Sequence, residues 1–150
     1  MHLNVGDVIW WNEFPYPKDG GIKARWFIYL GRSSVFHAPI FTYLCTTTTQ
    51  IEKFESGGPR TGHASKRFDI KNFPVFDREC VLDFDEELYE INENIIDRHR
   101  FNIEIKGSLD ENTMRNIYKQ LLRSGICSKV ILRDIHESYN RDGITGLKRP

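Results

Sequence analysis

An arginine and a run of threonines are the side chains of this 150-residue chain best suited to chemistry on a phosphate. Arg25 opens a hydrophobic segment directly after a glycine-containing loop, and Thr48 stands in the run 46–50 that closes the next such segment. If the two segments pair as neighbouring antiparallel strands, the start of one lies beside the end of the other. Arginine offers a fixed fork of donors that stabilises charge on a phosphate, and threonine hydroxyls donate to non-bridging oxygens. Such a pair of groups suffices to help an RNA 2′-hydroxyl attack its own phosphate, since the nucleophile belongs to the substrate. The structural alternatives are a surface arginine and a strand-edge threonine run.

The other reactive side chains form no recognisable catalytic or metal-binding pattern. The five histidines are scattered, and the sequence contains no phosphate-binding loop, dinucleotide-binding motif or nucleophile elbow. The acidic run 83–87 is mixed with apolar residues, which favours a solvated strand edge over a Mg²⁺ site. Three cysteines without CxxC spacing exclude a zinc ribbon and a paired disulfide framework, and Cys45 is expected to be a buried apolar filler. We therefore expect neither a metal ion nor another cofactor.

The formal net charge of zero hides a strong segregation of charge along the chain. Residues 1–13, 14–78, 79–111 and 112–150 carry net charges of −2, +5, −8 and +5. The second block contains the arginine and the threonine run, so overall neutrality does not argue against a local contact with a polyanion. Charge blocks of this kind are also typical of ordinary solvated faces. No stretch approaches the roughly 20 apolar residues of a membrane span, and no leader is evident at the start, so we expect a cytoplasmic protein without membrane contact.

The first half of the chain has the aromatic and β-branched composition of strands. Strands are predicted over 7–11, 25–30, 40–48, 68–70, 79–83 and 88–91, with loops over 14–21 and 55–67. Several short strands at this spacing suggest a small barrel or a strongly bent sheet. The acidic stretch 79–111 has no assigned role.

The second half changes to a helical period. Ser108 and Glu111 have the spacing of a capping box, and Met114, Ile117 and Leu121 follow on one face, so a helix is predicted over about 108–124 and ends near Gly125. Ser128 is expected to cap a second helix over about 128–139, although 130–132 also fits a strand. The organisation is α+β, with one domain over 1–140 and a frayed tail over 141–150.

Four short motifs, in this order, resemble landmarks of the MazF/PemK (Kid) toxin family. They are Val5-Gly6-Asp7-Val8-Ile9-Trp10, the Gly20–Arg25 loop that enters a hydrophobic strand, Leu44–Gln50, and Lys106-Gly107-Ser108-Leu109-Asp110 before an amphipathic helix. The resemblance covers the landmarks of residues 5–50 and 105–122. It implies a small SH3-like β-barrel with a C-terminal helix or helices, usually as a homodimer.

The activity implied by the resemblance is metal-independent, sequence-specific cleavage of single-stranded RNA that leaves a 2′,3′-cyclic phosphate. Such an mRNA interferase-like endoribonuclease is the toxin of a toxin–antitoxin pair and is restrained by a cognate antitoxin protein. Arg25 matches the family's catalytic arginine, and Thr48 matches its catalytic threonine or serine, with Thr47 and Thr49 as register alternatives. Where the family usually has proline after the arginine, this chain has Trp26, which could stack on a base.

An RNA groove is expected over the concave side of this barrel. The residues predicted to bind RNA are Lys18, Gly20, Gly21, Lys23, Trp26, Thr49, Gln50, Arg60, Lys66 and Arg67, and Arg78 is a further candidate because Asp77-Arg78-Glu79 loosely matches the family's Arg-x-Asp pair. Trp10, Trp11, Phe14 and Tyr16 are possible stacking surfaces. The alternative is that Trp10 belongs to the core and that Phe14 packs the loop. The rival function is a non-catalytic SH3-like module that binds RNA or an acidic peptide, and a third is an interaction subunit whose last helices pair with a partner.

Overall fold

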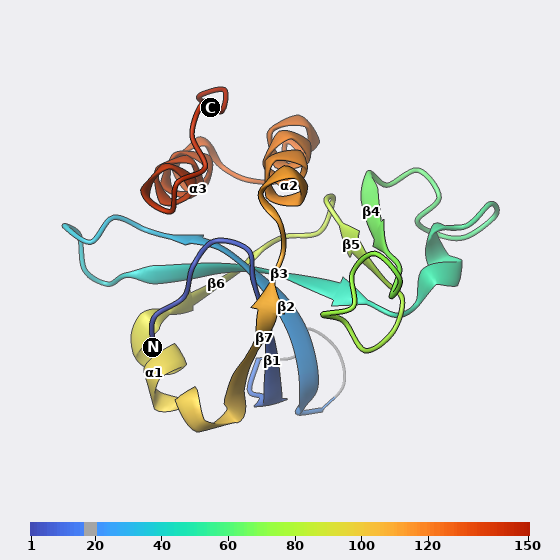
Figure 1. Ribbon diagram of the computed structural model, residues 1–150, viewed down its shortest axis with the longest axis horizontal. Helices are drawn as coiled ribbons and strands as arrows, with labels where there is room; N and C mark the ends of the chain where they lie inside the picture. The colour runs from blue at the N-terminus through green and yellow to red at the C-terminus, as the bar shows by residue number, and fades with distance from the viewer. Residues whose placement is uncertain (17–20) are drawn as a thin grey trace.

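A computed structural model describes residues 1–16 and 21–150 of the chain (Figure 1). Lys18 and Gly20, two of the predicted RNA contacts, lie outside the described residues. The elements, in chain order, are β1 (Asp7–Phe14), β2 (Lys23–Arg32), β3 (Phe41–Thr48), the 3₁₀ turn η1 (Ile51–Phe54), β4 (Ser65–Phe68), β5 (Cys80–Asp83), β6 (Tyr89–Asn92), α1 (Glu93–Arg98), the 3₁₀ turn η2 (Arg100–Asn102), β7 (Ile103–Ser108), α2 (Glu111–Ser124) and α3 (Lys129–Arg141).

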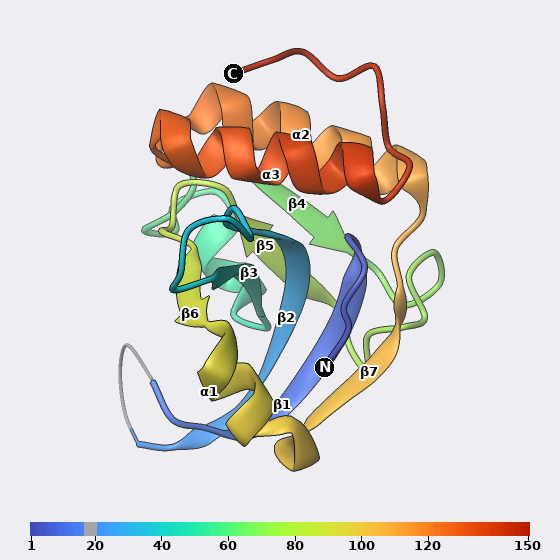
Figure 2. The same cartoon turned by 90° about the vertical axis from the view of Figure 1, so that its left-hand side faces the viewer.

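The seven strands form a curled antiparallel sheet that makes a half-barrel. Their order is β4-β5-β3-β2-β1-β7, and β6 adds to β3 beyond this path. Helices α2 and α3 lie side by side across one end of the sheet (Figure 2). The α+β class and the bent sheet that the sequence predicts are therefore confirmed.

The curled sheet has apolar side chains on both faces, and each face belongs to a different part of the core. Trp11, Phe14 and Phe27 pack their rings together on the inner face, with ring centroids 4.8–6.2 Å apart, and Tyr89 of β6 closes the group. On the other face α3 packs against β2. There Gly31, at φ +150°, lets the backbone of β2 approach Ser138 so closely that an added Cβ would stand 2.5 Å from the serine Cβ.

Both C-terminal helices exist, but the first has a different cap from the one predicted. Ser108 is the last residue of β7, and its hydroxyl donates to the Asp7 carboxylate at 2.7 Å. Asp110 caps α2 instead, because its carboxylate accepts from the backbone N–H of Thr113 at 2.8 Å. The predicted end of this helix is confirmed, since Gly125 has the left-handed conformation typical of a helix C-terminus.

The second helix is confirmed over Lys129–Arg141, which excludes the strand alternative for 130–132. The Ser128 hydroxyl accepts from the Ile131 N–H and caps it as predicted. The prediction of a frayed tail is wrong for the last residues. Ile144 is buried, and the carbonyl of Lys148 accepts a hydrogen bond from the Tyr118 hydroxyl, so the tail packs across the two helices (Figure 2).

Three further differences concern the middle of the chain. The strand expected at 68–70 lies earlier, at Ser65–Phe68, because Asp69 makes a turn in which its carboxylate accepts from the N–H of Asn72. Helix α1 and strand β7 have no counterpart in the sequence-based prediction. Strand β7 pairs with β1 along Ile103–Ser108 and forms one edge of the sheet. Among the described helices, none is both long enough and apolar enough to span a membrane.

Candidate functional site

The candidate site lies where strand β3 changes partners. Its first half pairs with β6 and β2, and the β2 ladder ends at the pair Phe27–Thr46. Beyond that point Thr47 and Thr48 pair with β5 instead. The start of β2, Lys23–Trp26, stays paired with β1, so β2 and β3 separate here. The threonine run therefore crosses from one part of the sheet to the other beside the start of β2, which is the juxtaposition predicted from the order of the two strands.

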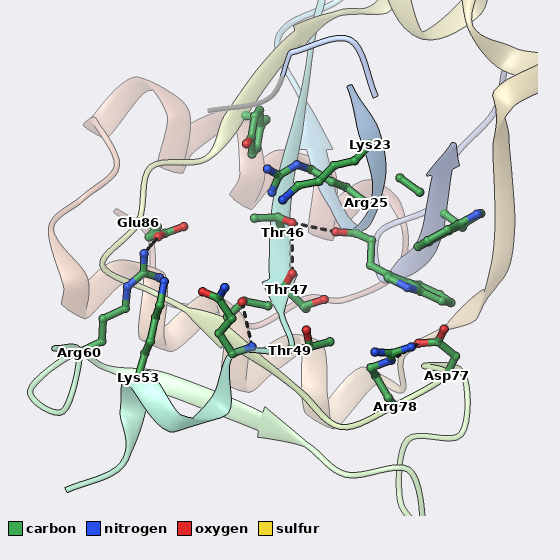
Figure 3. A pocket seen from close by; sticks show the side chains of 16 residues that line it. Lys23, Arg25, Thr46, Thr47, Thr49, Lys53, Arg60, Asp77, Arg78 and Glu86 are labelled. Carbon is green, nitrogen blue, oxygen red and sulfur yellow. Dashed lines mark hydrogen bonds and ion pairs between the residues drawn. The ribbon is translucent and has the colours of Figure 1, made fainter. Parts of the chain in front are cut away.

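A pocket of about 590 Å³ opens at this separation (Figure 3). Its basic lining residues are Lys23, Arg25, Lys53, Arg60 and Arg78, its acidic ones are Asp77 and Glu86, and the others are Trp10, Ala24, Trp26, Thr46, Thr47, Thr48, Thr49, Gln50 and Tyr89. Five basic and two acidic side chains leave a formal excess of three positive charges. Such a concave basic surface attracts phosphate groups.

The basic side chains reach the threonine run from three directions. Lys23 and Arg25 lie together at one end, Lys53 and Arg60 with Glu86 lie on one side, and Asp77 with Arg78 lies on the other (Figure 3). They come respectively from β2, from η1 and the loops flanking β4 and β5, and from the segment before β5. A single pocket thus gathers residues that are far apart in sequence.

Strand register separates the threonines by face. Phe27 and Thr46 are cross-strand partners and share a face of the sheet. Strand alternation puts Arg25 on the face of Phe27 and Thr48 on the face of Thr46, whereas Trp26 and Thr47 point to the opposite face. The Thr47 side chain accordingly turns to the other face, toward the Cys80 thiol. Thr48, and not Thr47, is the threonine on the side of Arg25.

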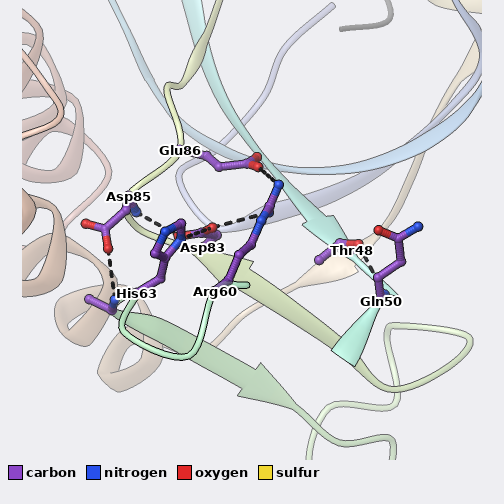
Figure 4. A network of polar contacts seen from close by, with 8 residues as sticks. Thr48, Gln50, Arg60, His63, Asp83, Asp85 and Glu86 are labelled. Carbon is purple, nitrogen blue, oxygen red and sulfur yellow. Dashed lines mark hydrogen bonds and ion pairs between the residues drawn. The ribbon is translucent and has the colours of Figure 1, made fainter. Parts of the chain in front are cut away.

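Hydrogen bonding distinguishes Thr48 from Thr46, which shares its face. The Thr46 hydroxyl donates to the Trp26 carbonyl at 3.0 Å, which uses its one hydrogen. The Thr48 hydroxyl instead accepts from the Gln50 N–H at 3.2 Å (Figure 4). This contact occupies a lone pair and leaves the hydrogen of Thr48 to donate to a bound anion. Thr48 is the better-placed donor of the two.

Arg60 is held in the pocket wall by two carboxylates (Figure 4). Its Nη2 lies 2.5 Å from Glu86 Oε1, and its Nη1 donates to Asp83 Oδ2 at 3.3 Å. Asp83 also contacts His63 Nδ1 at 2.8 Å. The side chain of Asp83 is only 3% exposed, so the expectation that the acidic run is a solvated edge is wrong at this position. Burial of the Asp83 carboxylate is tolerated because its negative charge is paired with Arg60 and accepts hydrogen bonds.

The same network contains the one group of described residues that could offer three ligands to a metal ion. Ligand atoms of His63, Asp83 and Asp85 lie within 4.8 Å of one another. However, both oxygens of Asp83 already accept from protein donors, one from Arg60 and the other from the Asp85 N–H. Asp85 in turn accepts from the Ala64 N–H. A cation here would have to compete with a guanidinium, so we treat the group as an ion-pair network.

Most of the predicted site residues meet in the pocket. Arg25, Thr47 and Thr48 line it, and so do six of the other predicted residues, namely Lys23, Trp26, Thr49, Gln50, Arg60 and Arg78. Gly21 is exposed and does not line it. Lys66 and Arg67 on β4 also lie outside the lining. The Lys66 amine stands over Phe68 and Phe73, 5.5 and 5.4 Å from their ring centroids, and Arg67 lies 3.6 Å from Glu79.

The aromatic side chains divide between core and pocket. Trp11 and Phe14 are fully buried and are unavailable to a base, whereas Trp10 and Trp26 are partly exposed and line the pocket. Tyr16 is exposed but does not contribute to the lining. Strand alternation explains the division, because Trp10 and Trp11 point to opposite faces of β1.

Sequence reasoning missed four polar lining residues, Lys53, Asp77, Glu86 and Tyr89. All four belong to turns or short elements whose approach to β3 depends on how β5 and β6 pair. The cysteines contribute no nucleophile. Burial raises the pKa of the Cys45 thiol to about 12 and that of Cys127 to about 11, so both are protonated at neutral pH, and the prediction of a buried Cys45 is confirmed.

Comparison of the sequence with models of protein families and with curated proteins gives no match.

Proposed function

We propose that this protein is a metal-independent endoribonuclease that cleaves single-stranded RNA, with an SH3-like, MazF/PemK-like barrel as its scaffold. The observation that carries the proposal is the meeting of Arg25 and Thr48 in a basic pocket that also presents two tryptophans. A pocket of about 590 Å³ has room for a short piece of single-stranded RNA, and its excess of positive charge suits the phosphodiester backbone of that RNA.

The reaction that fits these side chains takes its nucleophile from the substrate. The RNA 2′-oxygen attacks the adjacent phosphorus, the new O–P bond closes a 2′,3′-cyclic phosphate, and the bond to the 5′-oxygen breaks. The proton of the 2′-hydroxyl passes to solvent, and the departing 5′-oxygen takes one up. The protein's task is therefore to bind the phosphate and to stabilise the extra negative charge of the pentacoordinate state.

Arg25 is assigned to that charge and Thr48 to the orientation of the phosphate. A guanidinium stays protonated at any ordinary pH, so charge stabilisation and hydrogen bonding to the leaving oxygen suit Arg25 better than general acid catalysis. Thr48 donates its hydroxyl hydrogen to a non-bridging oxygen of the phosphate, while its hydroxyl oxygen accepts from the Gln50 N–H. Lys23 and Lys53 bind neighbouring phosphates of the strand.

The biological setting that goes with this activity is a cytoplasmic toxin–antitoxin pair. In that setting the protein acts as a homodimer and a cognate antitoxin blocks the basic pocket. An acidic antitoxin segment is the partner that the charge of this pocket favours.

The test is incubation of the protein with single-stranded RNA in EDTA, followed by analysis of the product ends. Cleavage to 2′,3′-cyclic phosphate and 5′-hydroxyl ends is expected, and Arg25→Ala should lower the rate about 100-fold or more. Thr48→Val tests the hydroxyl, because valine keeps the shape and removes the hydrogen bond. Arg67→Ala is the matched control, since Arg67 is an exposed arginine outside the pocket.

Two results separate the nuclease from its rivals. RNA binding that needs Lys23 and Arg25 but gives no product supports the non-catalytic binding module. Cleavage that requires Mg²⁺ contradicts the proposed mechanism and makes the group of His63, Asp83 and Asp85 the candidate metal site.

A further inference from the structure

We propose that the Trp26 side of the pocket is a guanine-binding subsite, formed by Trp26 as the stacking platform and by Asp77 and Arg78 as readers of the base edge. The inference rests on the proposed function, in that the guanine belongs to the RNA whose phosphate Arg25 holds.

The platform is the Trp26 ring, which two aromatic neighbours hold in place. Trp10 and Trp26 are cross-strand partners on β1 and β2, with ring centroids 5.1 Å apart and ring planes inclined at 55°. Phe76 packs edge-on against Trp26 at 5.8 Å. Both indoles are only partly buried and line the pocket. A ring that is fixed by its neighbours and faces a pocket can stack on a base at little cost in conformational entropy.

Asp77 and Arg78 directly follow Phe76 in the chain and line the same pocket as Trp26. Figure 3 shows these two side chains together on one side of that pocket. They contact each other only loosely, with Arg78 Nε 3.9 Å from Asp77 Oδ1, and the side chains of Arg78 and Asp77 are 68% and 57% exposed, respectively. Arg60, by contrast, is bound by Glu86 at 2.5 Å and by the buried Asp83. Asp77 and Arg78 are therefore the charged pair of the pocket that can turn to a ligand without breaking a buried ion pair.

A neighbouring carboxylate and guanidinium match guanine better than any other base. A carboxylate accepts two hydrogen bonds, from the N1–H and the N2 amino group of guanine, and a guanidinium donates two, to O6 and N7. Cytosine offers a carboxylate only its N4 amino group, and uracil offers only N3–H. Adenine has an amino group but no adjacent ring N–H. Guanine also has two rings, which increases stacking on Trp26 relative to the single-ring pyrimidines.

The subsite lies next to the centre that holds the phosphate. Arg25 and Trp26 are consecutive on β2 and point to opposite faces, and the pocket is continuous around the separation of β2 from β3. A strand whose phosphate lies at Arg25 and Thr48 can therefore place the adjacent base on the Trp26 side, across Thr47. The inference predicts cleavage next to a guanine.

The first measurement is binding of the four ribonucleoside monophosphates, followed by quenching of tryptophan fluorescence and corrected for absorbance with a free tryptophan derivative. Trp11 is fully buried, so quenching reports Trp10 and Trp26, and Trp26→Phe separates the two. GMP is expected to bind about 10-fold more tightly than AMP, CMP or UMP, which is within the discrimination of a bidentate contact. Asp77→Asn should abolish this preference. Glu79→Gln changes a half-buried carboxylate two residues away and outside the pocket lining, and it should leave the preference unchanged.

Cleavage in EDTA of RNAs that differ only in one base separates this inference from the proposed function. Binding of GMP with the stated preference but no cleavage of any RNA supports the subsite and contradicts the nuclease. Cleavage without regard to guanine, with equal quenching by all four nucleotides, contradicts the subsite and leaves the nuclease intact. Tightest binding of CMP or AMP, or an unchanged preference in Asp77→Asn, also overturns the subsite.

Discussion

The carboxylate of Glu86 limits how strongly the pocket binds a polyanion, and its removal gives a measurable change in salt dependence. Glu86 lies 2.5 Å from the Arg60 guanidinium in the pocket wall. The lining carries an excess of three positive charges, and Glu86→Gln raises this excess to four. The same change leaves Arg60 with Asp83 as its remaining ion-pair partner among the described residues.

The expected magnitude follows from counterion release. If each excess charge neutralises one phosphate of a single strand, the logarithm of affinity falls with the logarithm of salt with a slope of about −2.1 for the wild type and about −2.8 for Glu86→Gln. Between 50 and 200 mM salt the affinity therefore falls about 18-fold in the wild type and about 50-fold in the variant. At low salt the variant binds more tightly.

The assay is fluorescence anisotropy of a labelled 2′-O-methyl oligonucleotide, which binds but cannot be cleaved because it lacks the 2′-hydroxyl. Glu111→Gln is the matched control, since Glu111 also lies beside an arginine, with 3.4 Å to Arg115, but on α2 away from the pocket. A wild-type affinity independent of salt refutes the basic pocket as the RNA site. Equal slopes for the wild type and Glu86→Gln refute the role given to Glu86.

Three further predictions concern the scaffold. Gly31→Ala should destabilise the fold by about 2–5 kcal/mol in urea unfolding, because it combines a backbone conformation that suits only glycine with an overlap against Ser138. Hydrogen bonds from Thr113 hold the pKa of the Asp110 carboxyl below its usual value. The stability that this cap contributes is therefore present above the unfolded-state pKa and is lost as the pH falls through the lower folded-state pKa. Asp110→Asn should remove that part of the acid sensitivity of thermal unfolding. Cys45, whose thiol pKa burial raises to about 12, should resist a thiol reagent at pH 8 in the native state and react after unfolding in urea.

Each of these predictions has an outcome that contradicts it. A loss below 1 kcal/mol for Gly31→Ala indicates that α3 moves away from β2 without penalty, and Gly143→Ala, at a positive φ in open space, measures the cost of the backbone alone. An unaltered acid limb in Asp110→Asn shows that other carboxylates dominate acid unfolding. Modification of Cys45 in the native state at the rate seen in urea indicates that the sheet opens readily under α3.

Residue pattern alone determined the strands that carry the proposed chemistry and both C-terminal helices. Aromatic and β-branched runs specify β1, β2 and β3, because such side chains suit a pleated surface buried on both faces. Antiparallel pairing of consecutive strands then forces the start of β2 to lie beside the end of β3. The meeting of Arg25 with the threonine run was predictable for that reason.

Tertiary structure decided which threonine faces Arg25 and which charges share the pocket. The choice of Thr48 depends on the register of β2 with β3 and on the Thr47 contact with Cys80, and a shift of one residue would reverse the faces. Lys66 and Arg67 were expected in the groove, but β4 pairs on the far side of β5 and carries them away from it. Lys53, Asp77 and Glu86 come to the pocket from turns, where no periodicity indicates direction. The net charge of zero was therefore uninformative about the site, because the excess of three positive charges arises only when the chain folds and brings distant side chains to one surface.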